Sequence, residues 1–353
     1  MQTIDPTAPS ASERELLEAA RRGDEDAYGR LVRPHRSALQ AHCYRMLGSL
    51  HDAEDALQDA LLRAWRGLAR FEGRSSFRTW LYRIATNVCL KLIARRPKRV
   101  LPIGYGPAAD PRDRLGDPLA ESVWLEPYPD DALVAEPGLA APDARYEQRE
   151  SIELAFVAAL QPLPARQRAV LILRDVLGFS AAEVADVLET TPASVYSALQ
   201  RAHKGIAARL PEVSQQATLR SIGDASLRRL VQRFVEAWES ADIEAILALL
   251  TDDASLAMPP RPEWFRGPAA IGGFLRGAPL SGRHRWRLVP LRASGQVAFG
   301  TYCWDATAGT YAAHGVYVLG LRRERICEIT VFLTPALLPR FSLPHEVASD
   351  GSA

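Results

Sequence analysis

The chain has few of the features that would place a protein in a membrane or outside the cell. Its 353 residues contain no uninterrupted apolar run of about 18 residues, the length that a membrane-crossing helix needs. The first segment, Met1–Ser12, is polar and lacks the basic and then apolar pattern of a secretion signal. We therefore expect a cytoplasmic protein that has no membrane partner.

Cysteine is also scarce. The chain has four cysteines, Cys43, Cys89, Cys303 and Cys327, which lie far apart in the sequence and form no Cys-x-x-Cys pair. This spacing indicates neither a disulfide framework nor a zinc site. We expect buried free thiols, and neither a metal nor a cofactor.

The chain has no overall excess of either charge, because its formal net charge is only +1. The charges are nevertheless unevenly distributed. Residues 51–59 hold four carboxylates and no Lys or Arg, whereas residues 61–99 hold eleven Lys or Arg and one acid. Between residues 101 and 142, acids outnumber bases eight to two and eight prolines occur. We expect these segments to meet partners of different charge.

The first hundred residues are predicted to be helical, because apolar residues recur at intervals of three and four. The expected helices cover residues 13–22, 24–33, 36–47, 52–69 and 76–94. Residues 96–143 show no such periodicity and are rich in Pro, Gly and acid, so we expect an extended linker there. A further helix is expected over residues 145–160.

The next region has the pattern of a helix-turn-helix. A helix over residues 164–177 is ended by Gly178, and Ser180 with Glu183 forms a capping box that opens a short helix to residue 188. After a three-residue turn, Thr191 and Pro192 begin a longer helix that continues to residue 209. Two helices across a tight turn, the second ending in bases, are typical of DNA binding.

The pattern changes again after a polar hinge at residues 212–224. An amphipathic helix is expected from Leu227 to Trp238, and a second helix over residues 243–250. Strand-like runs follow at residues 255–258, 285–291, 296–304, 310–319 and 325–333. Helices followed by strands predict an α+β domain with a curved antiparallel sheet. The expected fold class is therefore multidomain, with two all-α domains before a C-terminal α+β domain.

The stretch from Asp52 to Trp65 resembles the core-binding helix of the sigma-70 superfamily, which docks on the β′ subunit of RNA polymerase. Three of its carboxylates recur at intervals of three and four, so they share one helix face and can pair with arginines. The charges alone would indicate only a solvated acidic face, and the segment that follows favours a binding surface. The resemblance implies the β′ and β subunits of the polymerase core as partners. The candidate polymerase-binding residues are Asp52, Asp55, Gln58 and Asp59.

Residues 71–87 resemble, almost residue for residue, the promoter −10 reading segment of extracytoplasmic-function (ECF) sigma factors. Aromatic rings can stack on splayed bases, and arginines can neutralise phosphates of the melted strand. Two of the aromatics, Phe77 and Trp80, are equally compatible with a place in the hydrophobic core. Asn87 matches the family position that lines the pocket for a flipped base. The candidate −10 residues are Phe71, Arg74, Ser76, Phe77, Trp80, Arg83 and Asn87.

Residues 163–204 resemble sigma region 4, which reads the −35 element, so promoter DNA is an expected partner. The chain departs from the family pattern, because Ser194–Gln200 lacks the basic residue usual in the recognition helix. We therefore expect base reading by uncharged side chains and phosphate contacts from the bases that follow. The candidate −35 residues are the readers Ser194, Tyr196, Ser197 and Gln200, and the phosphate contacts Arg201 and Lys204.

The acidic linker resembles the segment that threads the polymerase cleft, but its motif from Trp124 to Asp130 is too apolar for an idle linker. Similar motifs occur in ECF factors that carry a C-terminal SnoaL-like domain, and residues 222–340 resemble that cone-shaped domain. Two roles remain open for Trp124, Pro127 and Tyr128, a regulatory contact and a plain packing contact with a neighbouring domain. The cone also offers a place for a small ligand as a further partner.

The main hypothesis is an ECF sigma factor without catalytic residues whose appended domain modulates its activity. One alternative is a sigma-like DNA-binding protein fused to a small-molecule-converting enzyme, with His314, Asp253 or Asp305 as the general base. Another is a helix-turn-helix repressor that never binds polymerase. The expected domains are residues 12–99 for region 2, 100–143 for the linker, 144–211 for region 4 and 222–340 for the SnoaL-like domain.

Overall fold

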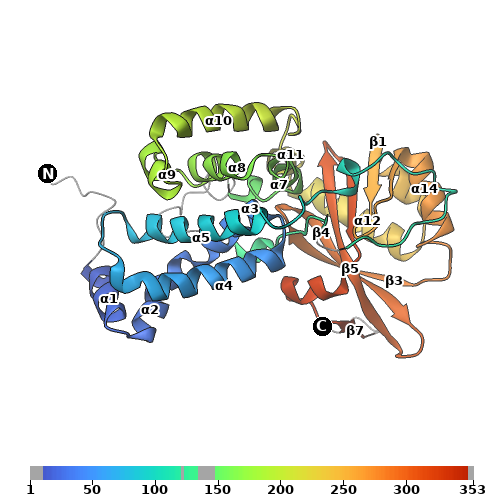
Figure 1. The fold of residues 1–353 in the computed structure, drawn as a ribbon. Coiled ribbons are helices and arrows are strands. Elements are labelled where there is room, and N and C mark those ends of the chain that lie inside the picture. Colours follow the sequence, from blue (N-terminus) through green and yellow to red (C-terminus); the bar gives the residue numbers. More distant parts are fainter. Residues whose placement is uncertain (1–10, 121–122, 134–147, 349–353) are drawn as a thin grey trace. The chain divides into compact units, whose positions relative to one another are not determined.

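The computed structural model describes residues 11–120, 123–133 and 148–348. Contacts between residues divide the chain into two compact units, one helical and one built around a sheet (Figure 1). The helical unit comprises residues 1–98, 132–151 and 155–210, and the C-terminal unit comprises residues 99–131, 152–154 and 211–353. The described linker residues up to Asp131 thus belong with the C-terminal domain.

The helical unit begins with the predicted series of amphipathic helices. They are α1 (Ala11–Arg21), α2 (Glu25–Val32), α3 (Arg36–Leu47), α4 (Leu50–Gly67) and α5 (Phe77–Ile93). The second group is α7 (Leu154–Leu160), α8 (Ala165–Leu171), a π-helical turn (Ile172–Val176), α9 (Ala181–Val187) and α10 (Pro192–Ala207). The helix-turn-helix is formed by α9 and α10, as the sequence predicts.

Local capping signals set several of these helix ends. The side chain of Ser180 accepts a hydrogen bond from Glu183 N at 3.2 Å, and the Glu183 carboxylate accepts one from Ser180 N at 2.8 Å. Thr191 caps α10, and Pro192 occupies its first position. Both caps satisfy backbone N–H groups that have no partner inside the helix.

The helix expected over residues 145–160 is wrong in its extent. Residues 145–147 lie outside the described part of the chain, and residues 151–153 are not helical. Instead, the Glu153 carboxylate accepts hydrogen bonds from the backbone N–H groups of Gln215 and Gln216, at 3.0 and 2.8 Å. These groups begin α11 (Gln215–Ile222), a helix in what the sequence indicated was only a polar hinge. A carboxylate at a helix N-terminus is favoured by the helix dipole.

The C-terminal unit is an α+β domain built on one sheet, in the strand order β2-β1-β6-β5-β4-β3, with β7 paired to β5. The helices are α12 (Asp224–Glu239), α13 (Ile243–Ala248) and α14 (Gly267–Gly277). The strands are β1 (Leu250–Ala257), β2 (Trp264–Arg266), β3 (Trp286–Ala293), β4 (Gln296–Asp305), β5 (Thr310–Arg322), β6 (Arg325–Phe332) and β7 (Glu346–Val347). The sheet is not purely antiparallel, because β1 pairs with β6 in parallel.

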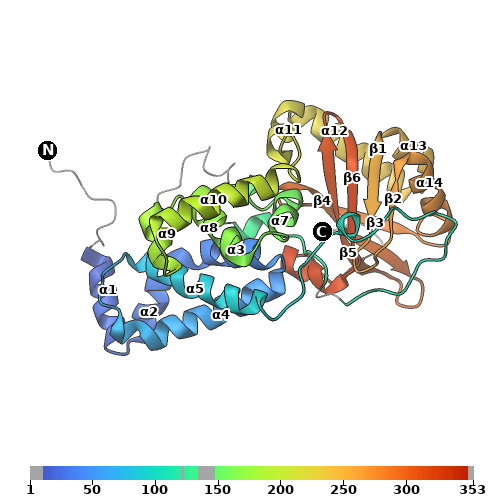
Figure 2. The ribbon, with the colours of Figure 1, turned by 45° about the horizontal axis from the view of Figure 1, so that its top comes forward.

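Helices cover one face of the sheet (Figure 2). Buried side chains fill the space between these helices and the sheet. The rings of Phe234 and Phe299 stack with their centroids 5.4 Å apart, and the rings of Trp238 and Tyr317 meet edge to face at 5.1 Å. All four residues are at most 2% exposed. This part of the cone is therefore a packed core.

Candidate functional site

The exposed face of α4 carries most of the predicted polymerase-binding residues. Asp55 and Gln58 are exposed, and Asp59 is half-buried and forms an ion pair with Arg63 at 2.7 Å. Leu62, one turn further along this face, is 47% exposed. An exposed leucine beside carboxylates is a feature that the sequence analysis missed, although it follows the same helical spacing. The face therefore offers acids and one apolar contact to a partner.

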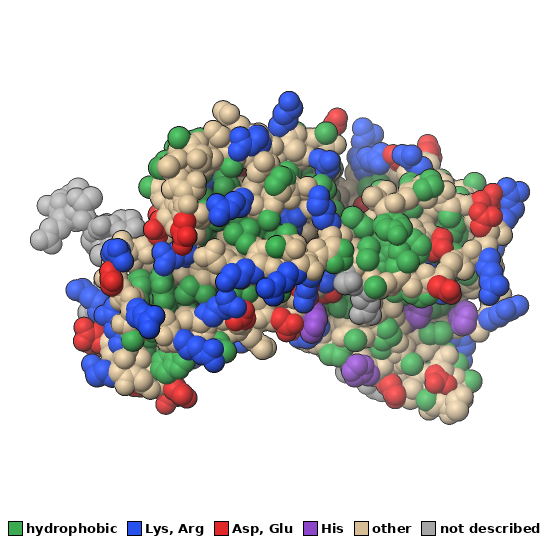
Figure 3. All heavy atoms as spheres, viewed as in Figure 1, with side chains coloured by type: hydrophobic (Ala, Val, Ile, Leu, Met, Phe, Trp, Pro, Cys, Tyr) green, Lys and Arg blue, Asp and Glu red, His purple; other side chains and the backbone are tan. Residues whose placement is uncertain are grey.

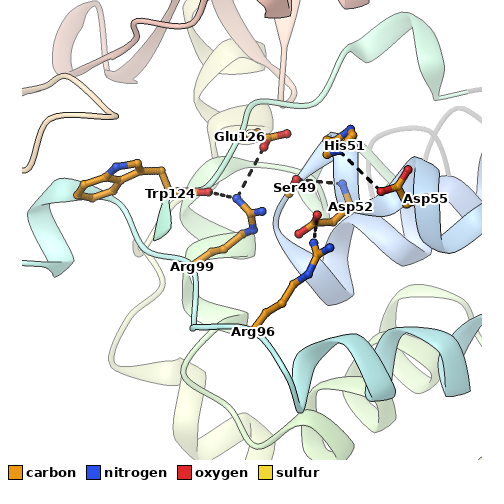
Figure 4. Close-up of polar contacts among 8 residues, drawn as sticks. All are labelled: Ser49, His51, Asp52, Asp55, Arg96, Arg99, Trp124 and Glu126. Atoms are coloured by element: carbon orange, nitrogen blue, oxygen red, sulfur yellow. Dashed lines mark hydrogen bonds and ion pairs between the residues drawn. The ribbon is translucent and has the colours of Figure 1, made fainter. Parts of the chain in front are cut away.

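Asp52 was predicted to belong to this face, but the structure buries its side chain, and its part in polymerase binding stays a prediction. Its side chain is 4% exposed and pairs with Arg96, which follows the end of α5 (Figure 4). Its backbone N–H donates to the Ser49 hydroxyl that caps α4. A carboxylate is buried only where a cation or hydrogen bonds compensate the loss of water. Asp52 therefore holds α4 to the segment after α5 and offers little surface to a partner.

The aromatic side chains of the predicted −10 segment form a small core. Phe71, Phe77 and Trp80 are 7%, 5% and 9% exposed. The ring centroid of Phe71 lies 6.0 Å from that of Phe77 and 4.9 Å from that of Trp80. In the described conformation these rings pack on one another and form part of the core, and their stacking on DNA bases stays a prediction.

The polar members of the same segment remain accessible. The side chain of Arg74 is 85% exposed and pairs with Glu72 at 2.9 Å. Ser76 caps α5 by accepting a hydrogen bond from Thr79 N at 3.0 Å. Arg83 and Asn87 are partly exposed and lie four residues apart, so they share one face of α5. The structure thus leaves the guanidinium groups and the Asn87 amide within reach of solvent, as the predicted −10 contacts require.

Another face of α5 is covered by the helix-turn-helix region of the same unit. The guanidinium of Arg78 lies 4.2 Å from the centroid of the Phe179 ring. The ring centroids of Tyr82 and Phe179 are 5.1 Å apart. The Thr79 hydroxyl donates to the Glu183 carboxylate at 3.4 Å. Tyr82 is fully buried as a result. No motif in the sequence signals this contact.

A buried arginine also ties the two helical groups of this unit together. Arg168 on α8 is 3% exposed, and its guanidinium donates to the Met46 carbonyl and to the Gln161 side chain. Burial lowers the pKa of Arg168 to about 10, so the group stays protonated at neutral pH. The hydrogen bonds offset the cost of burying the charge.

The candidate recognition helix α10 presents its predicted residues to solvent. Its buried side is formed by Val195, Ala202 and Ile206. Tyr196 is 55% exposed, so its ring is accessible. Lys and Arg side chains are spread over the face of the helical unit drawn in Figure 3. The exposed candidates are Ser194, Tyr196, Ser197, Gln200, Arg201 and Lys204.

The apolar linker motif is built into the C-terminal unit. Trp124, Pro127 and Tyr128 are all buried. Tyr128 exchanges hydrogen bonds with Ser294 at the turn between β3 and β4, at 3.0 Å from Tyr128 N to the hydroxyl and 2.7 Å from Ser294 N to the Tyr128 carbonyl. The carbonyl of Trp124 accepts a hydrogen bond from Arg99 at 2.6 Å (Figure 4).

Each of the three candidate general bases of the C-terminal unit contacts a different set of residues. His314 packs edge to face on Trp286 with ring centroids 4.8 Å apart, and burial lowers its pKa to about 4. Asp253 pairs with Arg322 at 2.9 Å, and Asp305 accepts hydrogen bonds from the backbone of its own turn. Within the described residues, no three His, Cys, Asp or Glu are arranged to hold a metal ion.

Comparison with known proteins assigns the class of each part. The sigma-70 region 2 model matches residues 31–99, the sigma-70 region 4 model matches residues 153–204, and the SnoaL-like domain model matches residues 231–329. The chain therefore combines the two DNA-reading regions of a sigma-70 protein with a SnoaL-like domain.

The family follows from a relative that covers nearly the whole chain, and a second relative covers about half of it. The ECF RNA polymerase sigma factor SigG of Mycobacterium tuberculosis is 42% identical over 329 residues, which cover 93% of this chain and 86% of the relative. SigM of the same species is 32% identical over 196 residues, covering 56% of this chain and 83% of the relative. The chain belongs to the ECF RNA polymerase sigma factors, with a fused SnoaL-like domain.

A solved structure supports the fold. The M. tuberculosis ECF sigma factor SigJ matches with a TM-score of 0.54 at 21% identity, over 88% of this chain and 97% of that chain. The predicted fold class, helical sigma domains followed by a sheet-rich C-terminal domain, is thus confirmed. In the part of the chain that the structure describes, no helix is long and apolar enough to span a bilayer.

Proposed function

We propose that the C-terminal domain modulates sigma activity by holding the linker that joins region 2 to region 4. The observation that carries this proposal is the set of hydrogen bonds by which the β3–β4 turn holds the linker motif. Beside the Tyr128–Ser294 pair, Gly295 N donates to the Asp130 carboxylate at 2.7 Å. A linker gripped at these points cannot adopt the conformations that polymerase binding requires of it without losing those bonds.

The sigma regions themselves take the following roles in this proposal. The α4 face with Asp55, Gln58 and Asp59 binds the β′ and β subunits of the polymerase core in the cytoplasm, through charge-assisted pairs. Arg74, Ser76, Arg83 and Asn87 contact the melted −10 strand. The exposed residues of α10 contact the −35 duplex.

Catalysis is no part of the proposed function. The three candidate bases are engaged with separate local partners, and the cone around Trp238 and Tyr317 is packed. A general base needs an open site next to it where a substrate can lie. The SnoaL-like domain therefore acts in this proposal as a binding module.

The test is transcription by reconstituted holoenzyme with the full chain, Trp124→Ala and Asp130→Asn. Trp124→Ala removes a buried ring from the linker, and Asp130→Asn removes the charge that faces the β3–β4 turn. Asp117→Asn is the matched control, because Asp117 lies exposed in the same linker. Equal transcription from all four proteins would contradict a regulatory role. A change of either sign in the first two variants only supports it.

A further inference from the structure

A groove of about 640 Å³ opens on the C-terminal unit between α12 and the strands β3 and β4. Leu227, Val231 and Val235 line it from the helix, and Pro290 and Phe299 line it from the strands. Its volume lies within the range of small-molecule sites, about 300–1,000 Å³. Phe299 belongs both to the wall of the groove and to the packed core, where its ring stacks on that of Phe234.

The helical wall of the groove is a second apolar stripe on α12. Leu230, Phe234 and Trp238 face the core and are buried. Val231 and Val235, each one residue further on, form a parallel ridge that stays partly exposed. This ridge packs against the edge of the core with its inner side, and its remaining exposed side lines the groove, where it can contact another apolar surface.

The groove has a positive end. The Glu239 carboxylate accepts a hydrogen bond from Leu288 N at 2.8 Å, which places the C-terminal end of α12 near the start of β3. A helix rises about 1.5 Å per residue and a strand about 3.3 Å. Arg228, near the start of α12, therefore lies toward Arg292 at the far end of β3, and both arginines line the groove.

The opposite end carries the single acid of the lining. Glu236 lies nearer the C-terminal end of α12 and accepts a hydrogen bond from Gln232 at 2.8 Å. The groove is thus apolar along its length, cationic at the end formed by Arg228 and Arg292, and anionic near the other end. This polarity selects a ligand with an acid group at one end and an apolar body.

We propose that this groove binds an amphipathic small acid, with its carboxylate at Arg228 and Arg292 and its apolar body along Val231, Val235 and Phe299. A guanidinium donates two parallel hydrogen bonds to a carboxylate, which fixes the head of such a ligand. The apolar walls remove its body from water, at about 25 cal/mol per Å² of buried apolar surface.

The proposed site is linked to the gripped linker through one side chain. Arg292 Nε lies 3.8 Å from the Asp130 carboxylate, whose other oxygen accepts the hydrogen bond from Gly295 N. A ligand carboxylate therefore competes with Asp130 for Arg292. This link between ligand and linker rests on the proposed regulatory function, whereas the site itself does not.

Because Asp130 competes with the ligand carboxylate for Arg292, one substitution should increase the affinity for the acid. Asp130→Asn removes the competing charge and keeps an oxygen that can accept from Gly295, so we expect it to bind the acid several-fold more tightly. Arg228→Gln should weaken binding about tenfold, and Val231→Asp should abolish it. The matched control is Arg233→Gln, which changes an exposed arginine of the same helix outside the groove.

The measurement is calorimetric titration of the full chain with dodecanoate below its micelle concentration, with dodecanol and dodecylammonium as probes of the head group. We expect one site that prefers dodecanoate to both. No binding, equal affinity for dodecanol, or equal effects of Arg228→Gln and Arg233→Gln would overturn the proposal. Binding that leaves transcription unchanged supports the site and contradicts the link between ligand and linker. The regulatory function fails separately, if Trp124→Ala and Asp130→Asn transcribe like the full chain.

Discussion

Replacing Asp52 by Asn separates a residue that stabilises region 2 from residues that bind polymerase. The substitution keeps the shape of the side chain and removes the charge that pairs with Arg96. Breaking a fully buried ion pair by removing one partner costs about 3–5 kcal/mol. The Arg96 side chain is 39% exposed, so water can solvate its guanidinium after the substitution. We therefore expect a loss of about 1.5–3 kcal/mol, the net value of a hydrogen bond to a charged group.

Charge reversal at an exposed position of the same helix should leave stability nearly unchanged and weaken binding to the polymerase core. Asp55 keeps 55% of its side chain exposed, so Asp55→Lys should change stability by no more than about 0.5 kcal/mol. It should weaken binding to the polymerase core, because the carboxylate face then carries a repelling cation. Arg96→Gln should cost more than Asp52→Asn, up to about 3–5 kcal/mol, because it leaves the buried Asp52 carboxylate without the cation that it pairs with. The double variant should lose less than the sum of the two single losses.

Two measurements decide between these outcomes. Hydrogen exchange at the amides of α4 reports local stability, which is better defined than a single unfolding free energy in a chain of two units. A titration with polymerase core reports affinity. If Asp52→Asn left exchange in α4 unchanged and weakened core binding as strongly as Asp55→Lys, the reassignment of Asp52 would be refuted.

Three further outcomes are expected. Arg201→Ala and Lys204→Ala should weaken binding to every promoter and each reduce the salt dependence by about one charge, as measured by DNA titration at several salt concentrations; unchanged slopes would exclude phosphate contacts. Asn87→Ala should impair promoter opening more than duplex binding, because a flipped base is read only after melting, and normal opening in a permanganate footprint would count against the pocket. Burial lowers the pKa of His42 from 6.5 to about 3, so the unfolded state binds one proton more than the folded state and stability falls as the pH drops from about 6.5 toward 3. His42→Gln should remove this one-proton dependence of the unfolding free energy on pH, as measured by urea titrations at several pH values. An unchanged pH dependence would be inconsistent with a neutral buried imidazole.

Features set by neighbours in sequence could be predicted from the sequence. The capping box of Ser180 and Glu183 and the cap at Thr191 need only residues within one helical turn. The amphipathic stripe of α12 follows from its spacing in the same way. The exposed positions of α10 follow because a helix with Val195, Ala202 and Ile206 on its buried side must present the intervening residues.

Features that depend on distant partners could not be predicted. Helical spacing places Asp52 with Asp55 and Asp59, but its burial depends on Arg96, which lies 44 positions further along the chain. The aromatic residues of the −10 segment satisfy a stacking motif and a core equally well, and only the packed rings distinguish the two. The place of the linker motif depends on a turn at Ser294 and Gly295, about 165 residues away.

The bonds of Glu153 and its neighbour have a mechanical consequence for region 4. Glu153 holds the start of α11, and Leu154 N donates to the Gln296 side chain at 3.2 Å. These contacts anchor the chain just before residue 155 and just after residue 210, so region 4 is a loop closed at both ends on the C-terminal domain. While these bonds last, the segments that lead into and out of region 4 are held together inside the C-terminal unit. Region 4 is therefore a closed loop even when it is unfolded, and a closed loop has fewer unfolded conformations to lose on refolding than a chain with a free end.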